Sequence, residues 1–468
     1  MKLQSLVAIL VVFPLASCLM GPDYKRPVVD VPTQYRGPAP AADATAGESL
    51  ADSEWFELFE DDVLKNLVDT ALEKNFDMRI AAERVFQARA QLGIAGSNLY
   101  PTLTANGQFV ANRGSSAGSI IFIPRGTPLD VSYTQTGFGL SWELDVWGRL
   151  RRLKESARAE YLATEEARHG VMTTLVSDVT GGYILLRELD LELEIAQKTR
   201  EIAENGLKLT RLRHDQGVVS SLDVRQAEQF LHTAAAETAS IERAIAQTEN
   251  AMSLLLGANP GSIPRGKSLG EIEAPETPPG MPSSLLERRP DIRQAEATLI
   301  AANARIGAAR AQYFPQISLT GMLDGQSRAL TDLFSGPARL WNFTSGATAP
   351  IFTAGRTRNN VRFTEAQQRE ALARYEQSIQ NAFREVSDAL IEYRKTGEQR
   401  EEQALLVDAL RETRRLSGVR YEGGLDSYLQ VLDADRNLFQ GELTLARLRQ
   451  RELAAVVELY RALGGGWS

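Results

Sequence analysis

The sequence has little of the chemistry that most enzymes use. Its 468 residues include a single cysteine, Cys18, and three histidines, His169, His214 and His232. One cysteine excludes an intramolecular disulfide, and the histidines lack the spacing of metal ligands. We therefore predict that the protein is not an enzyme and that it holds no metal and no cofactor.

Positive charge and long apolar runs are also scarce. The 52 Lys and Arg residues are outnumbered by 60 Asp and Glu residues, which gives a net charge of −8, and no segment gathers a basic surface. Nucleic acid is excluded as a partner because phosphate binding needs such a surface. Beyond the N-terminal segment, no apolar stretch is long enough for a transmembrane helix.

Aromatic residues make up only 7% of the chain, and long stretches consist mainly of Ala, Glu, Arg, Gln and Leu. This composition is typical of long helices. Segments 149–214 and 356–421 contain no proline. Each would form a helix about 100 Å long at ~1.5 Å per residue. No compact globular protein of this size needs such helices.

The chain contains an internal repeat. AQLGIAGSNLYP at 90–101 aligns with ARIGAARAQYFP at 304–315, and Gly217 aligns with Gly424. A repeat of this extent indicates two copies of one structural unit. Each copy is predicted to contain a helix, two strands, a very long helix, a short turn and another helix.

The N-terminus is typical of an export signal. Lys2 is followed by an apolar run over 6–16, which is too short to span a bilayer as a helix. The run ends in Leu-Ala-Ser-Cys at 15–18, which resembles the bacterial lipoprotein box, where the cysteine becomes the first mature residue and carries the lipid. We therefore predict a lipid anchor at Cys18; a buried free thiol is the alternative.

Four segments alternate between apolar and small or polar residues, with the period of two typical of β-strands. The predicted strands are 102–113, 131–144, 316–325 and 340–352. Strands of about ten residues with one apolar face match those of a transmembrane barrel. The aromatic residues near the strand ends are Trp142, Trp147, Trp341 and Phe343. They fit the aromatic girdles at the two membrane interfaces.

A membrane position for these strands requires several chains. Four strands cannot close a barrel, and lipid does not tolerate an open sheet edge. A small soluble sheet packed on helices is the alternative.

In 427–463, apolar residues recur every seven positions, which indicates sustained helix packing. Such helices fit the wall of a hollow tube, and an ordinary coiled-coil bundle is the alternative.

Two segments resemble those of a known family. GPDYKRP at 21–27 follows the cysteine, and LERRPDIRQAE at 286–296 precedes FPQISL at 314–319. With the repeat, these segments resemble the TolC-like outer-membrane factors, the exit ducts of tripartite efflux pumps, in their lipoprotein branch. The resemblance extends over essentially the whole chain.

The resemblance implies a mainly α fold with a transmembrane pair of β-hairpins, assembled as a homotrimer. Three copies of four strands would form a 12-stranded barrel in the outer membrane, continued by a 12-helix periplasmic tunnel. The implied partners are outer-membrane lipid, a periplasmic adaptor (membrane fusion protein) and, through it, an inner-membrane transporter of the RND type. The implied function is passive conduction of drugs or other small toxic compounds to the exterior.

Two other functions remain open. A duct for type I secretion of proteins or peptides has the same architecture, and a lipid-anchored periplasmic coiled-coil scaffold has no channel. The lipoprotein box favours the efflux branch. A passive duct takes its specificity from the inner-membrane transporter.

The chain is expected to divide into six segments. These are a signal peptide at 1–17, a lipid-anchored equatorial extension at 18–57, a first structural repeat at 58–256, a Pro/Gly-rich equatorial linker at 257–284, a second repeat at 285–463 and a C-terminal tail at 464–468. Within the repeats, helices are expected at 58–99, 149–214, 220–256, 356–421 and 427–463.

The resemblance implies that the functional residues lie at the tips, where each long helix turns into its partner. In the family these tips dock the adaptor, and the matching residues here are Arg213, Gly217, Arg420 and Gly424. Glycine at such a turn also has a structural explanation, because helices commonly end with a residue at positive φ. The alternative is that these residues only cap helices.

The family closes its periplasmic aperture with rings of side chains beside the second turn. The matching residues are Leu429 and Asp433, with Asp223 from the first turn, and Arg436 is added because it lies three positions after Asp433. Arg436 is expected to bind Asp433, Asp223 or a neighbouring chain. Gln430 stands where some members have Asp, and Asp426 where some have a basic residue. The two-tier acidic ring and the gate ion pair of those members are therefore not expected here.

Overall fold

The computed structural model describes residues 19–36, 49–50, 59–115, 129–275 and 282–466. The predicted signal peptide, the expected lipid anchor at Cys18 and most of the expected N-terminal extension lie outside these residues. The chain divides into two units, which are described in turn. The first comprises Met1–Pro27, Phe86–Ala163 and Glu296–Arg374, and the second comprises Val28–Val85, Thr164–Ala295 and Tyr375–Ser468.

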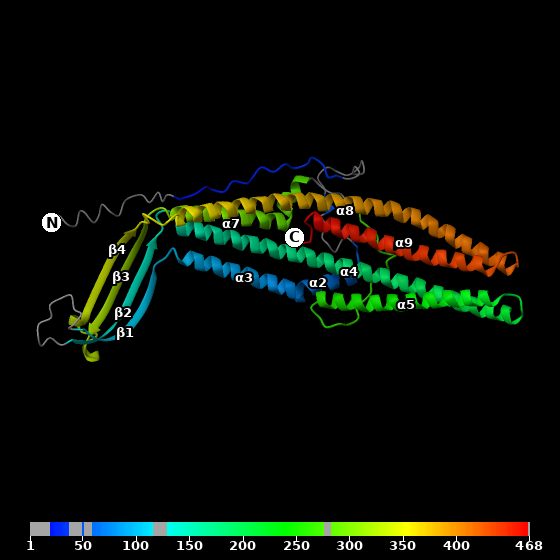
Figure 1. Ribbon diagram of the computed structural model, residues 1–468, viewed down its shortest axis with the longest axis horizontal. Helices are drawn as coiled ribbons and strands as arrows, with labels where there is room; N and C mark the ends of the chain where they lie inside the picture. Colours follow the sequence, from blue (N-terminus) through cyan, green and yellow to red (C-terminus); the bar gives the residue numbers. More distant parts are fainter. Residues whose placement is uncertain (1–18, 37–48, 51–58, 116–128, 276–281, 467–468) are drawn as a thin grey trace. The chain divides into compact units, whose positions relative to one another are not determined.

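The first unit contains an antiparallel four-stranded sheet in the order β1-β2-β3-β4 (Figure 1). The strands are β1 (Thr102–Arg113), β2 (Asp130–Leu144), β3 (Gln316–Ser327) and β4 (Arg339–Thr348). β4 ends at Thr348 and not at the expected residue 352. Pro350 explains the early end, because proline has no N–H for a ladder and restricts the residue before it. Within the described chain, β1 and β4 are the sheet edges.

The register gives the sheet one apolar face and one polar face. Leu103 on β1 is paired with Leu140 on β2, and Leu140 is paired with Gly321 on β3. Gly321 is in turn paired with Phe343 on β4. Directly paired residues project to the same face, because side chains alternate along each strand. Large apolar side chains on this face are exposed: Leu103, Phe109, Phe138, Leu323, Trp341 and Phe343. An exposed apolar patch of this kind marks a contact with lipid or another protein.

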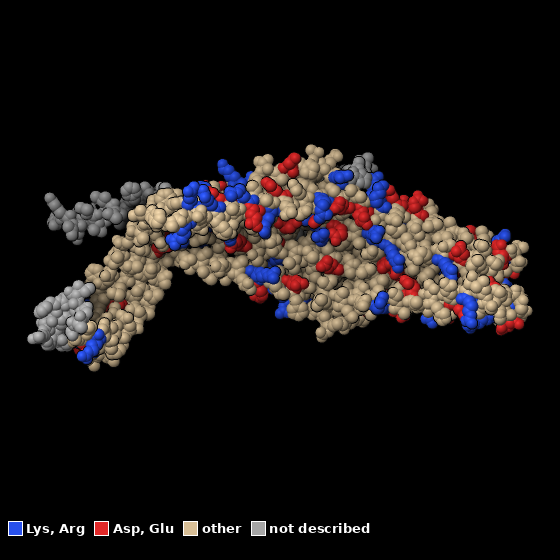
Figure 2. All heavy atoms as spheres, viewed as in Figure 1, with Lys and Arg blue, Asp and Glu red and all other residues tan. Residues whose placement is uncertain are grey.

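Charged side chains are distributed unevenly over the molecule. On the face shown in Figure 2, the sheet is almost free of Lys, Arg, Asp and Glu, whereas these residues cover the helices. No described helix combines the length and the apolar composition needed to cross a bilayer.

A ladder of polar side chains crosses the other face of the sheet. Gln108 Nε2 donates to Gln135 Oε1 at 3.0 Å, and Gln135 Nε2 donates to Asp324 Oδ2 at 2.5 Å. The three residues belong to β1, β2 and β3. Gly137 makes room for this ladder, because a Cβ there would lie 2.1 Å from Asp324 Oδ1. The polar face is thus tied together across three strands.

The two sequence signatures contact each other in the first unit. Asp23 of the GPDYKRP segment binds the buried Arg152 of α4 (Arg149–Asp215) at 2.7 Å. Tyr24 and Arg26 of the same segment donate to Glu296, the last residue of the LERRPDIRQAE segment, at 3.0 and 2.8 Å. The conspicuous residues of both segments therefore have a structural role in holding the N-terminal segment on the helices.

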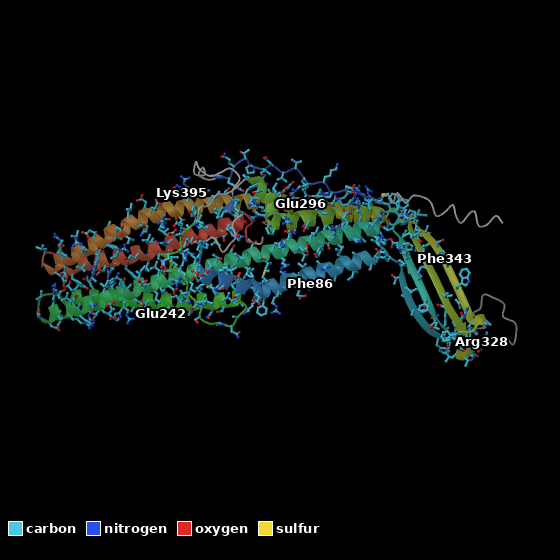
Figure 3. The ribbon with its side chains drawn as sticks, turned by 180° about the vertical axis from the view of Figure 1, so that it is seen from behind. Phe86, Glu242, Glu296, Arg328, Phe343 and Lys395 are labelled. Carbon is cyan, nitrogen blue, oxygen red and sulfur yellow. The ribbon has the colours of Figure 1, made fainter. Side chains whose placement is uncertain are left out.

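Long helices make up most of the described chain. The helices are α2 (Asp62–Lys74), α3 (Phe76–Ser97), α4, α5 (Ser221–Leu255), α6 (Leu285–Arg288), α7 (Pro290–Ala311), α8 (Arg356–Glu422) and α9 (Tyr428–Ala462), with 3-10 helices η3 (Pro282–Ser284), η4 (Leu330–Asp332) and η5 (Gly336–Ala338). α4 and α8 have 67 residues each, and α5 and α9 have 35 each. α5 lies beside α4, and α9 lies beside α8 (Figures 1 and 3).

The expected single helix over 58–99 is two helices, because Asn75 interrupts it. The Asn75 side-chain oxygen accepts hydrogen bonds from the N–H groups of Asp77 and Met78, at 2.7 and 3.1 Å. Its amide nitrogen donates to Leu255 O at 2.9 Å. An Asn side chain that caps a new helix in this way competes with continuation of the old one.

A buried network in the second unit joins α2, α4 and the linker after α5. Asp61 caps α2, and its Oδ2 accepts from the Tyr183 hydroxyl at 2.8 Å and from Lys267 N at 2.9 Å. The Tyr183 oxygen accepts from Gly266 N at 2.8 Å. Burial of Tyr183 raises its pKa, and the bond to Asp61 adds to that shift. All the groups named here have partners, so the network holds the linker in place.

Replacing Tyr183 by phenylalanine is expected to lower the free energy of unfolding by about 1–3 kcal/mol, because it removes the donor to the buried Asp61 carboxylate and the acceptor of Gly266 N–H. Thermal unfolding followed by circular dichroism measures this loss. The control is Tyr313→Phe, since the Tyr313 side chain is half exposed. Equal midpoints for the two variants would contradict the role assigned to the network.

Candidate functional site at the helix tips

The tips of the two helix pairs have the same backbone design. Gly217 after α4 and Gly424 after α8 have φ of 73° and 72°, which favours glycine. Val218 N donates to Arg213 O at 2.9 Å, and Leu425 N donates to Arg420 O at 2.9 Å. These bonds are those of a glycine-terminated helix. Both glycines therefore have a structural reason that is independent of any partner.

The two turns differ in how they begin the returning helix. Ser220 and Asp223 form a reciprocal cap at the start of α5, in which Ser220 N donates to Asp223 Oδ2 at 2.8 Å. At the second turn, Ser427 makes no side-chain cap, and Arg420 binds Asp426 at 2.5 and 3.2 Å. Hydrogen bonding to Arg420 lowers the pKa of Asp426. The expected aperture residue Asp223 is thus engaged in its own helix start.

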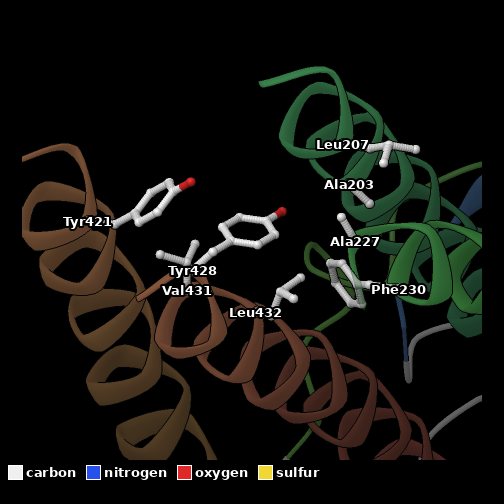
Figure 4. Close-up of a cluster of buried hydrophobic side chains, with 8 residues drawn as sticks. All are labelled: Ala203, Leu207, Ala227, Phe230, Tyr421, Tyr428, Val431 and Leu432. Atoms are coloured by element: carbon white, nitrogen blue, oxygen red, sulfur yellow. The ribbon is translucent and has the colours of Figure 1, made fainter. Parts of the chain in front are cut away.

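A buried apolar cluster joins the two tips (Figure 4). Its members are Ala203, Leu207, Ala227, Phe230, Tyr421, Tyr428, Val431 and Leu432. They come from α4, α5, α8 and α9, so the cluster connects both helix pairs. Burial raises the pKa of Tyr428. Gly206 on α4 makes room for this ring, because a Cβ there would lie 2.6 Å from the Tyr428 oxygen.

Arg213 and Tyr421 connect the tips a second time. The Arg213 guanidinium lies 4.3 Å from the centre of the Tyr421 ring, a cation–π contact. The Tyr421 ring lies 5.3 Å from the Tyr428 ring. Sequence analysis selected Arg213 but missed both tyrosines. The signal was a pair of tyrosines seven positions apart on either side of a glycine turn.

A partly buried ion pair lies behind the second tip. Arg414 Nε on α8 donates to Asp435 Oδ1 on α9 at 2.9 Å, and the Asp435 carboxylate is mostly buried. Burial raises the pKa of Asp435, although the bond to Arg414 acts in the opposite direction. The pair fixes α9 against α8 one turn beyond the apolar cluster.

The other expected aperture residues lie on the exposed side of α9. Leu429 is 47% exposed, and Asp433 and Arg436 are also exposed. Asp433 Oδ2 accepts from Asn437 Nδ2 at 3.3 Å. Within the described chain, Arg436 forms no ion pair with Asp433 or Asp223. The structure thus brings Leu429, Asp433 and Arg436 to one surface and leaves Asp223 on the other helix pair.

The expected membrane-interface aromatics divide into two kinds. Trp142 Nε1 donates to Leu99 O at 3.0 Å, and Trp147 Nε1 donates to Pro315 O at 2.8 Å. Trp147 also stacks on Phe314 at 4.7 Å. These two indoles fix the junctions between strands and helices in the first unit. The N–H group of each indole therefore has a polar partner.

Trp341 and Phe343 have a different setting, because they stand on the exposed apolar face of β4. They are 77% and 61% exposed. Figure 3 shows Phe343 on the sheet. Phe343 is paired with Gly321 in the middle of β4, so its expected position near a strand end is wrong. Trp341 is closer to the start of the strand. The described residues contain no cluster of His, Cys, Asp and Glu suited to a metal.

The sequence is similar to known outer membrane proteins. The family model described as outer membrane efflux protein matches residues 67–258 and 281–465. The solvent efflux pump outer membrane protein SrpC of Pseudomonas putida is 39% identical over 475 residues, which cover 100% of this chain and 99% of that protein. The cation efflux system protein CusC of Escherichia coli O6:H1 is 36% identical, with 98% of this chain and 97% of that protein covered.

The fold is also found among solved structures. The open state of the MtrE outer membrane channel of Neisseria gonorrhoeae matches with a TM-score of 0.86 at 31% identity, covering 96% of this chain and 99% of that one. The family match extends over more than half of the sequence, which confirms the expected resemblance. The chain therefore belongs to the outer membrane efflux protein family.

Proposed function

We propose that the protein is the outer-membrane exit duct of a tripartite efflux pump, and that it works as a homotrimer. The observation that carries the proposal is the sheet, with one exposed apolar face, one polar face and two open edges. Lipid requires such edges to be paired. Three copies would close a 12-stranded barrel, with the apolar face toward lipid and the polar face toward water.

The long helices would continue the duct as a 12-helix tunnel in the periplasm. In this arrangement, the internal repeat lets each chain contribute two similar helix pairs to the wall. Cys18 would carry the lipid anchor, and the segments 18–57 and 257–284 would form the equatorial belt. The domain boundaries expected from the sequence remain part of this proposal.

The compounds that pass through the duct are proposed to be drugs or other small toxic molecules. SrpC is named for solvent efflux and CusC for cation efflux, and the eight compared relatives are all named for efflux rather than for protein secretion. A passive channel needs no catalytic group. The inner-membrane transporter, proposed to be of the RND type, would select the substrate.

The helix tips are the proposed docking surface for the periplasmic adaptor. The proposed contact residues are Arg213, Gly217, Arg420 and Gly424. Val218 and Leu425 support this role because they follow the two glycines and are 67% and 71% exposed. Apolar residues held at the tip of a rigid turn suit a partner that binds end to end.

Mass measurement of the detergent-solubilised mature protein, followed by planar-bilayer conductance of the same sample, tests the proposed assembly. A conducting trimer is expected, because only a closed barrel satisfies the edge strands in lipid. A monomer without conductance would overturn the duct and favour a lipid-anchored scaffold.

Leu429, Asp433 and Arg436 are proposed to line the aperture, since three copies of one exposed surface would meet at the symmetry axis. Arg436 would then bind a neighbouring chain. Replacing both Asp433 and Arg436 by alanine is expected to raise single-channel conductance several-fold by removing these contacts between chains.

The control for this prediction is Arg384→Ala with Asp388→Ala, an exposed ion pair of 3.1 Å on α8. It removes the same two types of charge from the same kind of helix surface. Unchanged conductance in the aperture variant, or an equal rise in the control, would contradict the aperture assignment.

A further inference from the structure

Two glutamates are buried side by side in α4. Glu188 is 4% exposed and Glu192 is 3% exposed. Because they lie four positions apart, they occupy the same face of the helix. Side chains four positions apart on a helix are neighbours, so the two carboxyl groups interact electrostatically. Two such carboxylates repel each other when both are charged and buried, which favours a proton on one of them.

One cation faces this pair in the described chain. Arg447 Nε of α9 lies 2.6 Å from Glu192 Oε1. Arg187 and Asp190, although adjacent in sequence, are engaged with the linker, where Arg187 donates to Lys267 O at 2.8 Å and Asp190 binds Arg265 at 3.1 Å.

The next charges along α9 are also committed elsewhere. Arg451 lies 3.8 Å from Glu392 of α8, and Glu452 binds Arg400 of α8 at 2.7 Å. The local charge is therefore two carboxyl groups against one guanidinium. One proton makes this set neutral, and within it the two glutamates are buried whereas Arg447 is half exposed.

Burial makes the second negative charge expensive. Burial, together with the negative charge of Glu192, raises the pKa of Glu188 to about 8, although Arg447 acts in the opposite direction. The folded protein therefore keeps a proton that the unfolded chain releases near the ordinary carboxyl pKa of 4.5.

We propose that Glu188 and Glu192 form a proton-binding site that holds one shared proton, and that loss of this proton weakens the packing of α4 on α9. The site is next to a buried cluster formed by Leu189, Ala196, Ile241, Phe439 and Leu443. This cluster joins α4, α5 and α9, so charge repulsion at the site acts on a contact of three helices. The proposal does not depend on the proposed function.

The direction of the pH effect follows from proton linkage. Because the pKa of Glu188 is raised in the folded state, its contribution to stability is fully present below pH 4.5 and is lost as pH rises to about 8. Above that pH, the loss is complete and constant. Glutamine at position 188 keeps the neutral form at every pH and retains a donor for Glu192.

The test measures the thermal midpoint of the full-length protein in the oligomeric state in which it is purified. Wild type and Glu188→Gln are compared at about pH 5 and pH 9. The difference between the two midpoints, Glu188→Gln minus wild type, is expected to be larger at pH 9 than at pH 5 by about 3 °C or more. The matched control is Glu194→Gln, because Glu194 is exposed on the same helix. Its difference from wild type is expected to stay constant.

Infrared spectroscopy supplies a second readout. The carbonyl band of a protonated carboxyl group should be present in wild type at pH 7, vanish as pH rises through about 8, and be missing in Glu188→Gln. A midpoint difference that does not change with pH, or a spectrum at pH 7 that is identical in wild type and Glu188→Gln, would overturn the proposal.

Discussion

Replacing Gly137 by alanine is expected to prevent the protein from accumulating in its folded, membrane-inserted form. A Cβ at Gly137 would lie 2.1 Å from Asp324 Oδ1, 2.3 Å from Leu323 O and 2.5 Å from Asp324 Cα. Two of these atoms belong to the backbone of β3, so β3 itself must move. Overpacking of a well-packed site costs about 1–3 kcal/mol, and displaced ladder bonds add to this cost.

The matched control is Gly107→Ala in β1. A Cβ there would have one neighbour, Thr136 Oγ1, at an ordinary distance of 3.6 Å. The yield of folded protein from the outer-membrane fraction and its thermal midpoint measure the difference. A normal yield and midpoint for Gly137→Ala would contradict the pairing of β2 with β3.

A second variant distinguishes the effect of the Asp324 side chain from that of the β3 backbone. Asp324→Ala removes the carboxylate above Gly137 but leaves Leu323 O and Asp324 Cα where they are. It is therefore not expected to rescue Gly137→Ala. Rescue would mean that the polar ladder, and not the close approach of the two strands, explains the glycine.

Regular features of the fold were accessible from the sequence because they depend on local patterns. The alternation from Thr102 to Arg113 ends where β1 ends, and the helix α4 extends through Gly170 and Gly206 without interruption. When one face of a strand is buried, apolar residues recur at every second position. When one face of a helix is buried, they recur at every third or fourth position, so both leave a periodic pattern in the sequence. Such a pattern survives single residues of low propensity.

The features that sequence analysis missed depend on contacts between distant segments. Asn75 divides a helical pattern because its side chain caps the next helix and also reaches Leu255. Glu188 and Glu192 have the spacing of an ordinary exposed helix face, and only the packing of α9 buries them. The sequence alone does not distinguish a buried glutamate from a solvated one.

The candidate site was predicted unevenly for the same reason. Turn chemistry identified Gly217 and Gly424 directly, since positive φ selects glycine. The partners of Arg213 and Arg420 were not predicted, because Tyr421 and Asp426 become their neighbours only when the turn is formed. Asp433, one of the three partners considered for Arg436, accepts a hydrogen bond from Asn437.

Replacing Tyr428 by alanine is expected to separate the two tips and to raise single-channel conductance several-fold. The ring is 6% exposed and packs between Tyr421 and α4. Removing a buried aromatic ring costs about 3–5 kcal/mol. Hydrogen exchange is expected to increase in 203–210 and 421–432, the segments that the ring holds together.

Tyr428→Phe is the conservative control, because it keeps the ring and removes only the hydroxyl. It is expected to retain most of the stability and nearly the conductance of wild type. If both variants conduct like wild type, the buried cluster does not hold the tips together. If both conduct equally more, the Tyr428 hydroxyl and not the ring is the connection.

A side chain added to α4 opposite Tyr428 tests the same contact from the other helix. Alanine in place of glycine within a helix normally stabilises it by about 1 kcal/mol. Gly170→Ala is expected to show this gain, since nothing lies within 4 Å of the added Cβ. Gly206→Ala places its Cβ 2.6 Å from the Tyr428 oxygen and is expected to lose stability and to raise conductance instead. Both glycines belong to one helix, so changes in stability of opposite sign must come from the atoms that each added Cβ meets. Equal gains in stability for the two variants would exclude a tight contact between α4 and Tyr428.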